Sequence, residues 1–157
     1  MTMPTDEARN FNWLLGSFVE ETSGVTDAVA VSSDGMLIAR SNTLDSEESE
    51  QLCAIISGCA SLAQAADRAM ESQGVERVII AMERGFLFVS AIADGSCLGV
   101  VATRACDVGS VGYQTTELVT RVGELLTPAL REELKQIASA NAPDPPPPPL
   151  VPRGERG

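Results

Sequence analysis

The feature that most constrains the fold is the stretch Asp45–Gln73, which the sequence predicts to be one long helix. Asp45 is a good N-cap residue, and Glu48 stands three residues later, where a capping box needs it. Gly74 is placed to end the helix. About 29 residues at ~1.5 Å each give a rod of roughly 43 Å, which is long for a chain of 157 residues. We therefore expect the rest of the chain to be arranged around this helix.

Two stripes of this helix carry apolar or small side chains at helical spacing. The first stripe is predicted to pack on a sheet and consists of Leu52, Ile55, Ile56, Cys59, Leu62, Ala63, Ala66 and Met70. The second stripe lies about 100° away and holds only small residues, which are Ala54, Gly58, Ser61, Ala65 and Ala69. A glycine inside a helix costs ~1 kcal/mol relative to alanine unless packing compensates. Two interpretations stay open for this stripe: an alanine-rich helix with good propensity, or a close contact with another helix of this chain or of a second copy.

The rest of the chain predicts short elements separated by tight turns. They are a helix from Thr5 or Asp6 to about residues 21–23, strands over 25–32, 36–40, 75–82, 86–92 and 97–103, a helix over 107–127 and a short helix from Pro128 to about Ser139. The strands carry apolar residues at both parities, so helices are expected on both faces of the sheet. The turns after the long helix are too short for crossovers, which makes the last three strands antiparallel. For Trp13, the only tryptophan, core packing is expected, and an exposed anchor for a partner is the alternative.

Composition and charge exclude several classes of function. The formal net charge is -11 and Lys135 is the only lysine, so nucleic acid and anionic membranes are not expected partners. There is no apolar run of ~18 residues and no secretory signal, which predicts a cytoplasmic protein without membrane insertion. The absence of histidine excludes Ser–His and Cys–His pairs and HExxH zinc sites. No phosphate-binding loop is present, so we expect neither catalysis nor a cofactor.

The cysteines and two glycines receive structural interpretations. Cys53, Cys59, Cys97 and Cys106 form no CxxC motif and are expected to be buried free thiols rather than metal ligands or disulfides. Gly109 and Gly112 open the last main helix, where close helix–sheet packing is favoured over anion binding.

The composition changes after residue 139, which marks the predicted end of a single domain over residues 1–139. Pro145–Pro149 is an uninterrupted proline run, and residues 140–157 are expected to form a disordered tail. This tail is interpreted as a spacer or a plain terminus, with a ligand for an aromatic-lined groove as the alternative. Leu150–Gly154 matches a thrombin-type cleavage sequence, to which no function is assigned.

The order of elements and three local motifs resemble the Roadblock/LC7 family. The motifs are Gly24-Val-Thr-Asp-Ala-Val-Ala-Val-Ser-Ser-Asp-Gly35 followed by Leu37-Ile-Ala39, then Ile79-Ile-Ala-Met-Glu-Arg-Gly-Phe-Leu-Phe-Val89, and Gly95-Ser-Cys-Leu-Gly-Val100. The Glu-Arg-Gly and Ser-Cys-Leu sequences are most similar to bacterial members, including those encoded in actinobacterial conservon operons. These operons also encode small Ras-like GTPases and sensor-kinase-like proteins.

The resemblance implies a profilin-like three-layer α/β/α sandwich with elements in the order α-β-β-α-β-β-β-α. Its five-stranded, mainly antiparallel sheet would have the strand order 2-1-5-4-3. It also implies a homodimer in which the third strands pair and the two long helices lie side by side. In this sequence the interface would consist of Val78, Ile79, Ile80, Ala54, Gly58, Ser61, Ala65 and Ala69. An edge strand as apolar as residues 78–81 would be an aggregation hazard if it stayed unpaired.

The resemblance further implies a non-enzymatic regulator or scaffold that binds a small Ras-like GTPase, with a sensor-kinase-like protein as a further partner. No arginine is assigned as an arginine finger, and Arg40, Arg77 and Arg84 are interpreted as solvated surface charges. The alternative function is a small-ligand or redox sensor module, because similar sheets occur in sensory domains. Such a module would need a cavity with convergent polar groups or a cysteine of low pKa.

Overall fold

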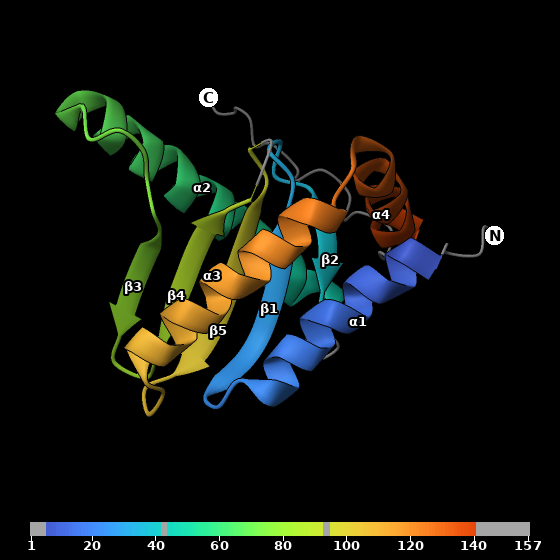
Figure 1. Ribbon diagram of the computed structural model, residues 1–157, viewed down its shortest axis with the longest axis horizontal. Coiled ribbons are helices and arrows are strands. Elements are labelled where there is room, and N and C mark those ends of the chain that lie inside the picture. Colours follow the sequence, from blue (N-terminus) through green and yellow to red (C-terminus); the bar gives the residue numbers. More distant parts are fainter. Residues whose placement is uncertain (1–5, 42–43, 93–94, 141–157) are drawn as a thin grey trace, which may run out of the picture.

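The computed structural model describes residues 6–41, 44–92 and 95–140. It contains a five-stranded antiparallel sheet with helices on both faces (Figure 1). The elements are α1 (Asp6–Glu21), β1 (Val25–Val31), β2 (Leu37–Arg40), α2 (Ser46–Met70), β3 (Val78–Met82), β4 (Gly85–Ala91), β5 (Cys97–Thr103), α3 (Val108–Leu125) and α4 (Pro128–Ala140). The strand order is β2-β1-β5-β4-β3, which confirms the predicted topology.

The sheet separates two apolar cores. Helices α1, α3 and α4 cover one core, which includes Phe11, Phe88 and Leu118. Helix α2 covers the other, which includes Val29 and Ile56. Successive strand residues point to opposite faces, so apolar residues at both parities are needed to fill both cores. The predicted three-layer arrangement is therefore confirmed.

Helix α1 buries the apolar face that its sequence predicts. Phe11, Leu14, Leu15 and Phe18 are buried at i, i+3, i+4, i+7 spacing. The core-packing prediction for Trp13 is wrong, because this side chain is 67% exposed. At 100° per residue Trp13 lies about 200° from Phe11, on the outer side of the helix.

Helix α4 begins where the sequence predicts, at Pro128. The Thr127 side-chain hydroxyl accepts a hydrogen bond of 3.1 Å from the backbone N–H of Leu130 and so caps the helix. Leu130 and Leu134 are buried in the core beside β2. The Lys135 ammonium lies 3.9 Å from the Asp34 carboxylate in the β1–β2 turn. Helix α4 is thus the fourth helix within the described residues, and it packs beside the edge strand β2.

The connection between α2 and β3 differs from the prediction. Helix α2 ends at Met70 rather than Gln73, because Glu71 adopts a left-handed conformation with φ of 51°. The Asp67 carboxylate accepts hydrogen bonds of 2.7 Å from the Ser72 hydroxyl and from the Gly74 N–H. These two bonds lower the pKa of Asp67. Strand β3 consequently begins at Val78, three residues later than predicted.

Some predictions concern residues outside the described ranges. The predicted disordered tail, residues 140–157, lies there except for its first residue, Ala140, which is the last residue of α4. All four cysteines are free thiols, of which Cys53 and Cys97 are buried, whereas Cys59 and Cys106 are partly exposed.

Candidate interaction surface

The N-terminal half of α2 is fixed to the sheet. The Asp45 carboxylate accepts a hydrogen bond of 2.8 Å from the Glu48 N–H, and the Glu48 carboxylate accepts one from the Asp45 N–H, which completes the predicted capping box. Ser49, Cys53 and Ile56 are the buried residues of this helix. Ile56 packs directly on Gly99 of β5, where a Cβ atom would lie 2.1 Å from the Ile56 Cδ1 atom. The helix can approach the sheet this closely because residue 99 has no side chain.

The prediction that the first stripe of α2 packs on the sheet is only partly correct. Ile56 is buried and Leu52, Cys59 and Ala63 are half-buried, whereas Ile55, Leu62, Ala66 and Met70 are exposed. Leu62 and Met70 are 74% and 75% exposed. A helix of 25 residues is ~37 Å long, whereas five strands at ~4.8 Å spacing are about 20 Å wide. The C-terminal half of α2 therefore extends past the sheet, toward and beyond β3 (Figure 1).

The small-residue stripe faces away from the sheet. All five of its members are exposed, and they are Ala54, Gly58, Ser61, Ala65 and Ala69. Gly58 is two positions from Ile56, which places it about 200° around the helix. A Cβ atom added at Gly58 would meet nothing within 4 Å. No contact within the described chain therefore explains a glycine in the middle of this helix.

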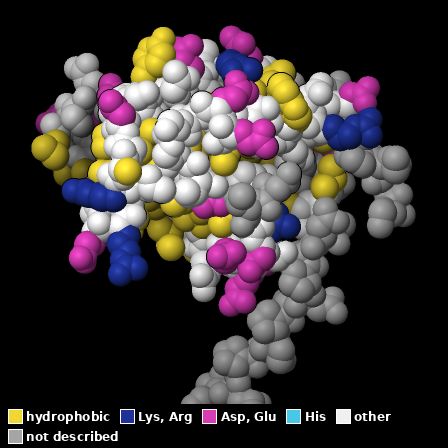
Figure 2. Space-filling model, turned by 90° about the horizontal axis from the view of Figure 1, so that it is seen from below, with side chains coloured by type: hydrophobic (Ala, Val, Ile, Leu, Met, Phe, Trp, Pro, Cys, Tyr) yellow, Lys and Arg dark blue, Asp and Glu magenta, His cyan; other side chains and the backbone are white. Residues whose placement is uncertain are grey.

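Strand β3 lies at the edge of the sheet beside this part of α2. Within the described residues it pairs only with β4, so its other side presents unpaired backbone groups. Val78 and Ile80 pack half-buried toward α2, whereas Ile79 is 42% and Met82 47% exposed. The view from below shows hydrophobic side chains reaching the surface at the left, the side of β3 (Figure 2). Leu62, Met70 and Met82 also lie on this exposed surface and were not predicted there. The length of α2 relative to the width of the sheet would have indicated the first two.

The arginines are less solvated than the sequence predicts. The Arg77 side chain is 23% exposed and donates a hydrogen bond of 2.9 Å to the Thr116 hydroxyl of α3. It lies over Gly112, where a Cβ atom would come within 2.2 Å of its Nη1 atom. Gly112 therefore accommodates this arginine, which corrects the expectation of simple helix–sheet packing. Arg40 is also half-buried and donates to the Ser49 hydroxyl at 3.2 Å, whereas Arg84 is exposed as expected.

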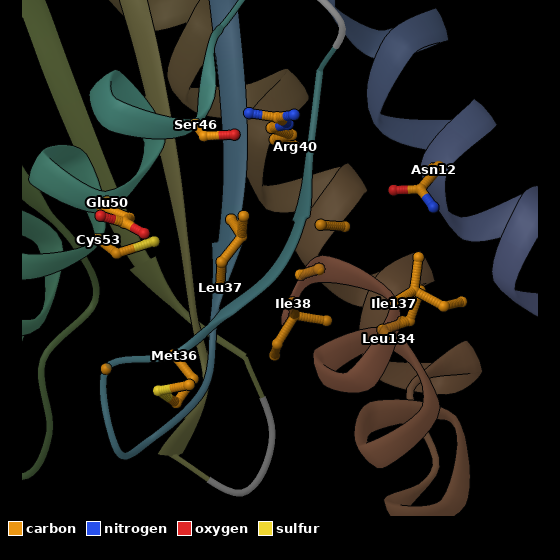
Figure 3. Close-up of a pocket in the computed structure, with 13 residues that line it drawn as sticks. Asn12, Met36, Leu37, Ile38, Arg40, Ser46, Glu50, Cys53, Leu134 and Ile137 are labelled. Atoms are coloured by element: carbon orange, nitrogen blue, oxygen red, sulfur yellow. The ribbon is translucent and has the colours of Figure 1, made fainter. Parts of the chain in front are cut away.

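A cavity of about 540 Å³ surrounds β2, the opposite edge strand. Figure 3 shows Glu50 and Cys53 of α2 on one side of β2, and Leu134 and Ile137 of α4 on the other. Burial, together with the Glu50 charge, raises the pKa of Cys53 to about 11. Burial also raises the pKa of Cys97. Both thiols are protonated at neutral pH, which argues against a redox sensor built on either of them.

Two further observations apply to residues 6–41, 44–92 and 95–140. In these ranges no three His, Cys, Asp or Glu side chains are grouped so that they could hold a metal ion. None of the helices there combines the length and the apolar character that crossing a membrane requires.

Comparison with known proteins identifies the family. The sequence model of the Roadblock/LC7 domain matches residues 11–102, which is more than half of the chain. The chain belongs to the Roadblock/LC7 family. A crystal structure of a Roadblock/LC7 domain from Streptomyces avermitilis is 32% identical and superimposes with a TM-score of 0.67, covering 71% of this chain and 92% of that one. No curated protein sequence gives a significant match.

More distant structures share the fold of this Roadblock/LC7 chain. MglB of Myxococcus xanthus is 11% identical with a TM-score of 0.70, over 81% of this chain and 98% of MglB. The profilin in a complex named LokiProfilin1/rabbit actin is 11% identical with a TM-score of 0.50, over 79% of this chain and 100% of that one. The sheet is thus profilin-like, as predicted.

Proposed function

We propose that the chain is a homodimer formed through β3 and the outer face of α2. The observation that carries this proposal is an unpaired apolar edge strand beside a helix face whose small and apolar residues have no partner in the described chain. Antiparallel pairing of two β3 strands would satisfy the free backbone groups and join two sheets. The small residues at 54, 58, 61, 65 and 69 would then allow the two α2 helices to approach closely. Family membership supports the same interface.

We further propose that this dimer is a non-enzymatic regulator or scaffold for a small Ras-like GTPase in the cytoplasm. Membership of the Roadblock/LC7 family supports this role, because the family is regulatory rather than catalytic. The resemblance to conservon-encoded members extends the proposal to a sensor-kinase-like protein as a further partner. No arginine is proposed as a catalytic finger, since Arg40 and Arg77 are held by hydrogen bonds within the chain.

Gly58→Leu tests the interface without disturbing the subunit. We expect this variant to be monomeric at concentrations where the wild type is dimeric, because a leucine at the helix crossing keeps the two backbones apart. The subunit itself should gain about 0.5–1 kcal/mol from improved helix propensity, since the site is open. Light scattering coupled to size exclusion measures the mass, and thermal unfolding measures the stability.

Gly16→Leu is the matched control for this substitution. Gly16 is also inside a helix and has nothing within 4 Å of an added Cβ atom, but it lies on α1, away from the proposed interface. It should leave the dimer intact. A dimeric Gly58→Leu variant would place the interface elsewhere, and a monomeric wild type would contradict the proposal directly.

The partner is tested by a pull-down with purified small Ras-like GTPases from the source organism. Each GTPase is loaded with GDP or with a non-hydrolysable GTP analogue, and the immobilised wild-type chain is expected to retain at least one of them. Binding should differ between the two nucleotide states, because the switch loops of such GTPases change order with the nucleotide. A dimer that retains none of them in either state would refute the GTPase role and leave the dimer proposal standing.

A further inference from the structure

A groove distinct from the cavity at β2 is lined by residues of α1 and α3. These two helices lie on the face of the sheet opposite α2 (Figure 1). The groove has a volume of about 650 Å³. The α1 side contributes Trp13, Ser17 and Glu21, and the α3 side contributes Ser110, Gln114 and Arg121. The proposed dimer uses the other face of the molecule, so this groove has no role in it.

Trp13 is the most unusual residue of this groove. It is the only tryptophan of the chain, and it is 67% exposed at the groove rather than packed in the core. An exposed indole offers a flat apolar face together with one N–H donor, which is the chemistry of aromatic grooves that bind proline-rich segments. The sequence contains one such segment, Pro145–Pro149.

We propose that the α1–α3 groove binds the proline run Pro145–Pro149 of the same chain. A proline run adopts the polyproline II conformation, which has no internal hydrogen bonds and no backbone N–H donors. It therefore presents only rings and carbonyl acceptors. The groove offers the complementary groups: the indole face of Trp13 for the rings, and donors on Trp13, Gln114 and Arg121 for the carbonyls.

The lengths of the two parts agree. The α1 wall runs from Trp13 to Glu21, which is nine residues or about 14 Å of helix. Five prolines in polyproline II conformation span roughly 15 Å. The run would fill the groove from the indole to the C-terminal end of α1.

The described chain ends in α4, which packs against α1, one of the two helices that line the groove. Ala138, near the end of α4, lines the same cavity as Asn12 of α1, the residue next to Trp13. Residues 141–144 can span up to about 14 Å in extended form. Because the run belongs to the same chain as its proposed site, its effective concentration there is high and weak contacts suffice for binding.

The single tryptophan makes a direct test possible in the full-length chain. All five residues Pro145–Pro149 are replaced by serine, which keeps the chain length. Compared with this variant, the wild type is expected to show a blue-shifted Trp13 emission and weaker quenching by acrylamide, because the proline rings cover the indole. Adding a free peptide with the sequence of residues 143–150 should blue-shift the emission of the serine variant toward that of the wild type.

The matched control replaces Pro143 and Pro152, which flank the run, by serine. It should behave as the wild type. Identical emission and quenching in the wild type and the five-serine variant would overturn the proposal. A blue shift of the wild type that vanishes on dilution would overturn docking in the same chain, because it would mean that the run binds a neighbouring copy. Loss of the dimer in Gly58→Leu does not affect this test, so the two proposals fail independently.

Discussion

At the scale of residues, two close contacts in this fold are possible because a glycine stands at the point of contact and has no side chain. Gly99 allows Ile56 to reach the backbone of β5, and Gly112 accommodates the guanidinium of Arg77. The two sites differ in what a methyl group would displace. The Arg77 guanidinium ends a flexible, partly exposed side chain, whereas Ile56 is fully buried with neighbours on all sides. A substitution is therefore expected to be more costly at Gly99.

We predict that Gly99→Ala lowers the free energy of unfolding by about 1–3 kcal/mol, because the new methyl group would overlap the Cδ1 and Cγ1 atoms of Ile56. Urea denaturation at one fixed protein concentration measures the effect. Gly109→Ala is the control, since its Cβ atom would have no neighbour closer than 3.5 Å.

A double-mutant cycle separates this overlap from a general strand effect. Ile56→Val removes Cδ1, so the combined variant with Gly99→Ala should lose less stability than the sum of the two single variants. Strict additivity would mean that the contact between the two residues is not the cause.

At the scale of elements, the sequence predicted what local periodicity and turn chemistry determine. The capping box of α2, the amphipathic face of α1 and the start of α4 at Pro128 all depend on neighbours within a few residues, and all three are confirmed. The strand order came from the resemblance to a family rather than from the pattern itself.

The wrong predictions concern places where the length or the end of one element depends on another part of the chain. The stripe on α2 looks continuous in sequence, but only its first half lies over the sheet, so Leu62 and Met70 are exposed. The early end of α2 depends on the side chain of Asp67, which binds the Ser72 hydroxyl and the Gly74 N–H. Helical periodicity alone places Trp13 on the outer side of α1. The prediction of core packing followed the residue type rather than this position. The width of the sheet and the hydrogen bonds of the Asp67 carboxylate both depend on tertiary structure, which local sequence periodicity does not reveal.

Two observations bear on the predicted interface. The small residues of α2 face outward and β3 is an edge strand, as the proposed dimer requires. The pairing itself stays a prediction. Of the predicted interface, Val78 and Ile80 already pack against their own core, so Ile80→Lys would also weaken the subunit. Gly58 is the cleaner probe, because its substitution acts only on what approaches from outside.

At the scale of the whole molecule, charge opposes the proposed assembly. Each copy has a formal net charge of -11, so two copies repel each other while their apolar surfaces attract. Repulsion between whole molecules is long-ranged and is screened by salt, whereas contact between apolar side chains is not. The Debye length falls from about 30 Å at 0.01 M to about 8 Å at 0.15 M ionic strength.

We therefore predict that the dimer dissociation constant decreases on the order of tenfold between these two ionic strengths, because screening removes repulsion and leaves apolar contact. Analytical ultracentrifugation over a concentration series measures it. Replacing Glu20 and Glu124, which are exposed on α1 and α3, by glutamine should reduce the salt dependence while leaving the constant at high salt unchanged. A dissociation constant that instead rises with salt would mean that ion pairs dominate the interface, and the apolar surface of β3 and α2 would then not be what holds the two copies together.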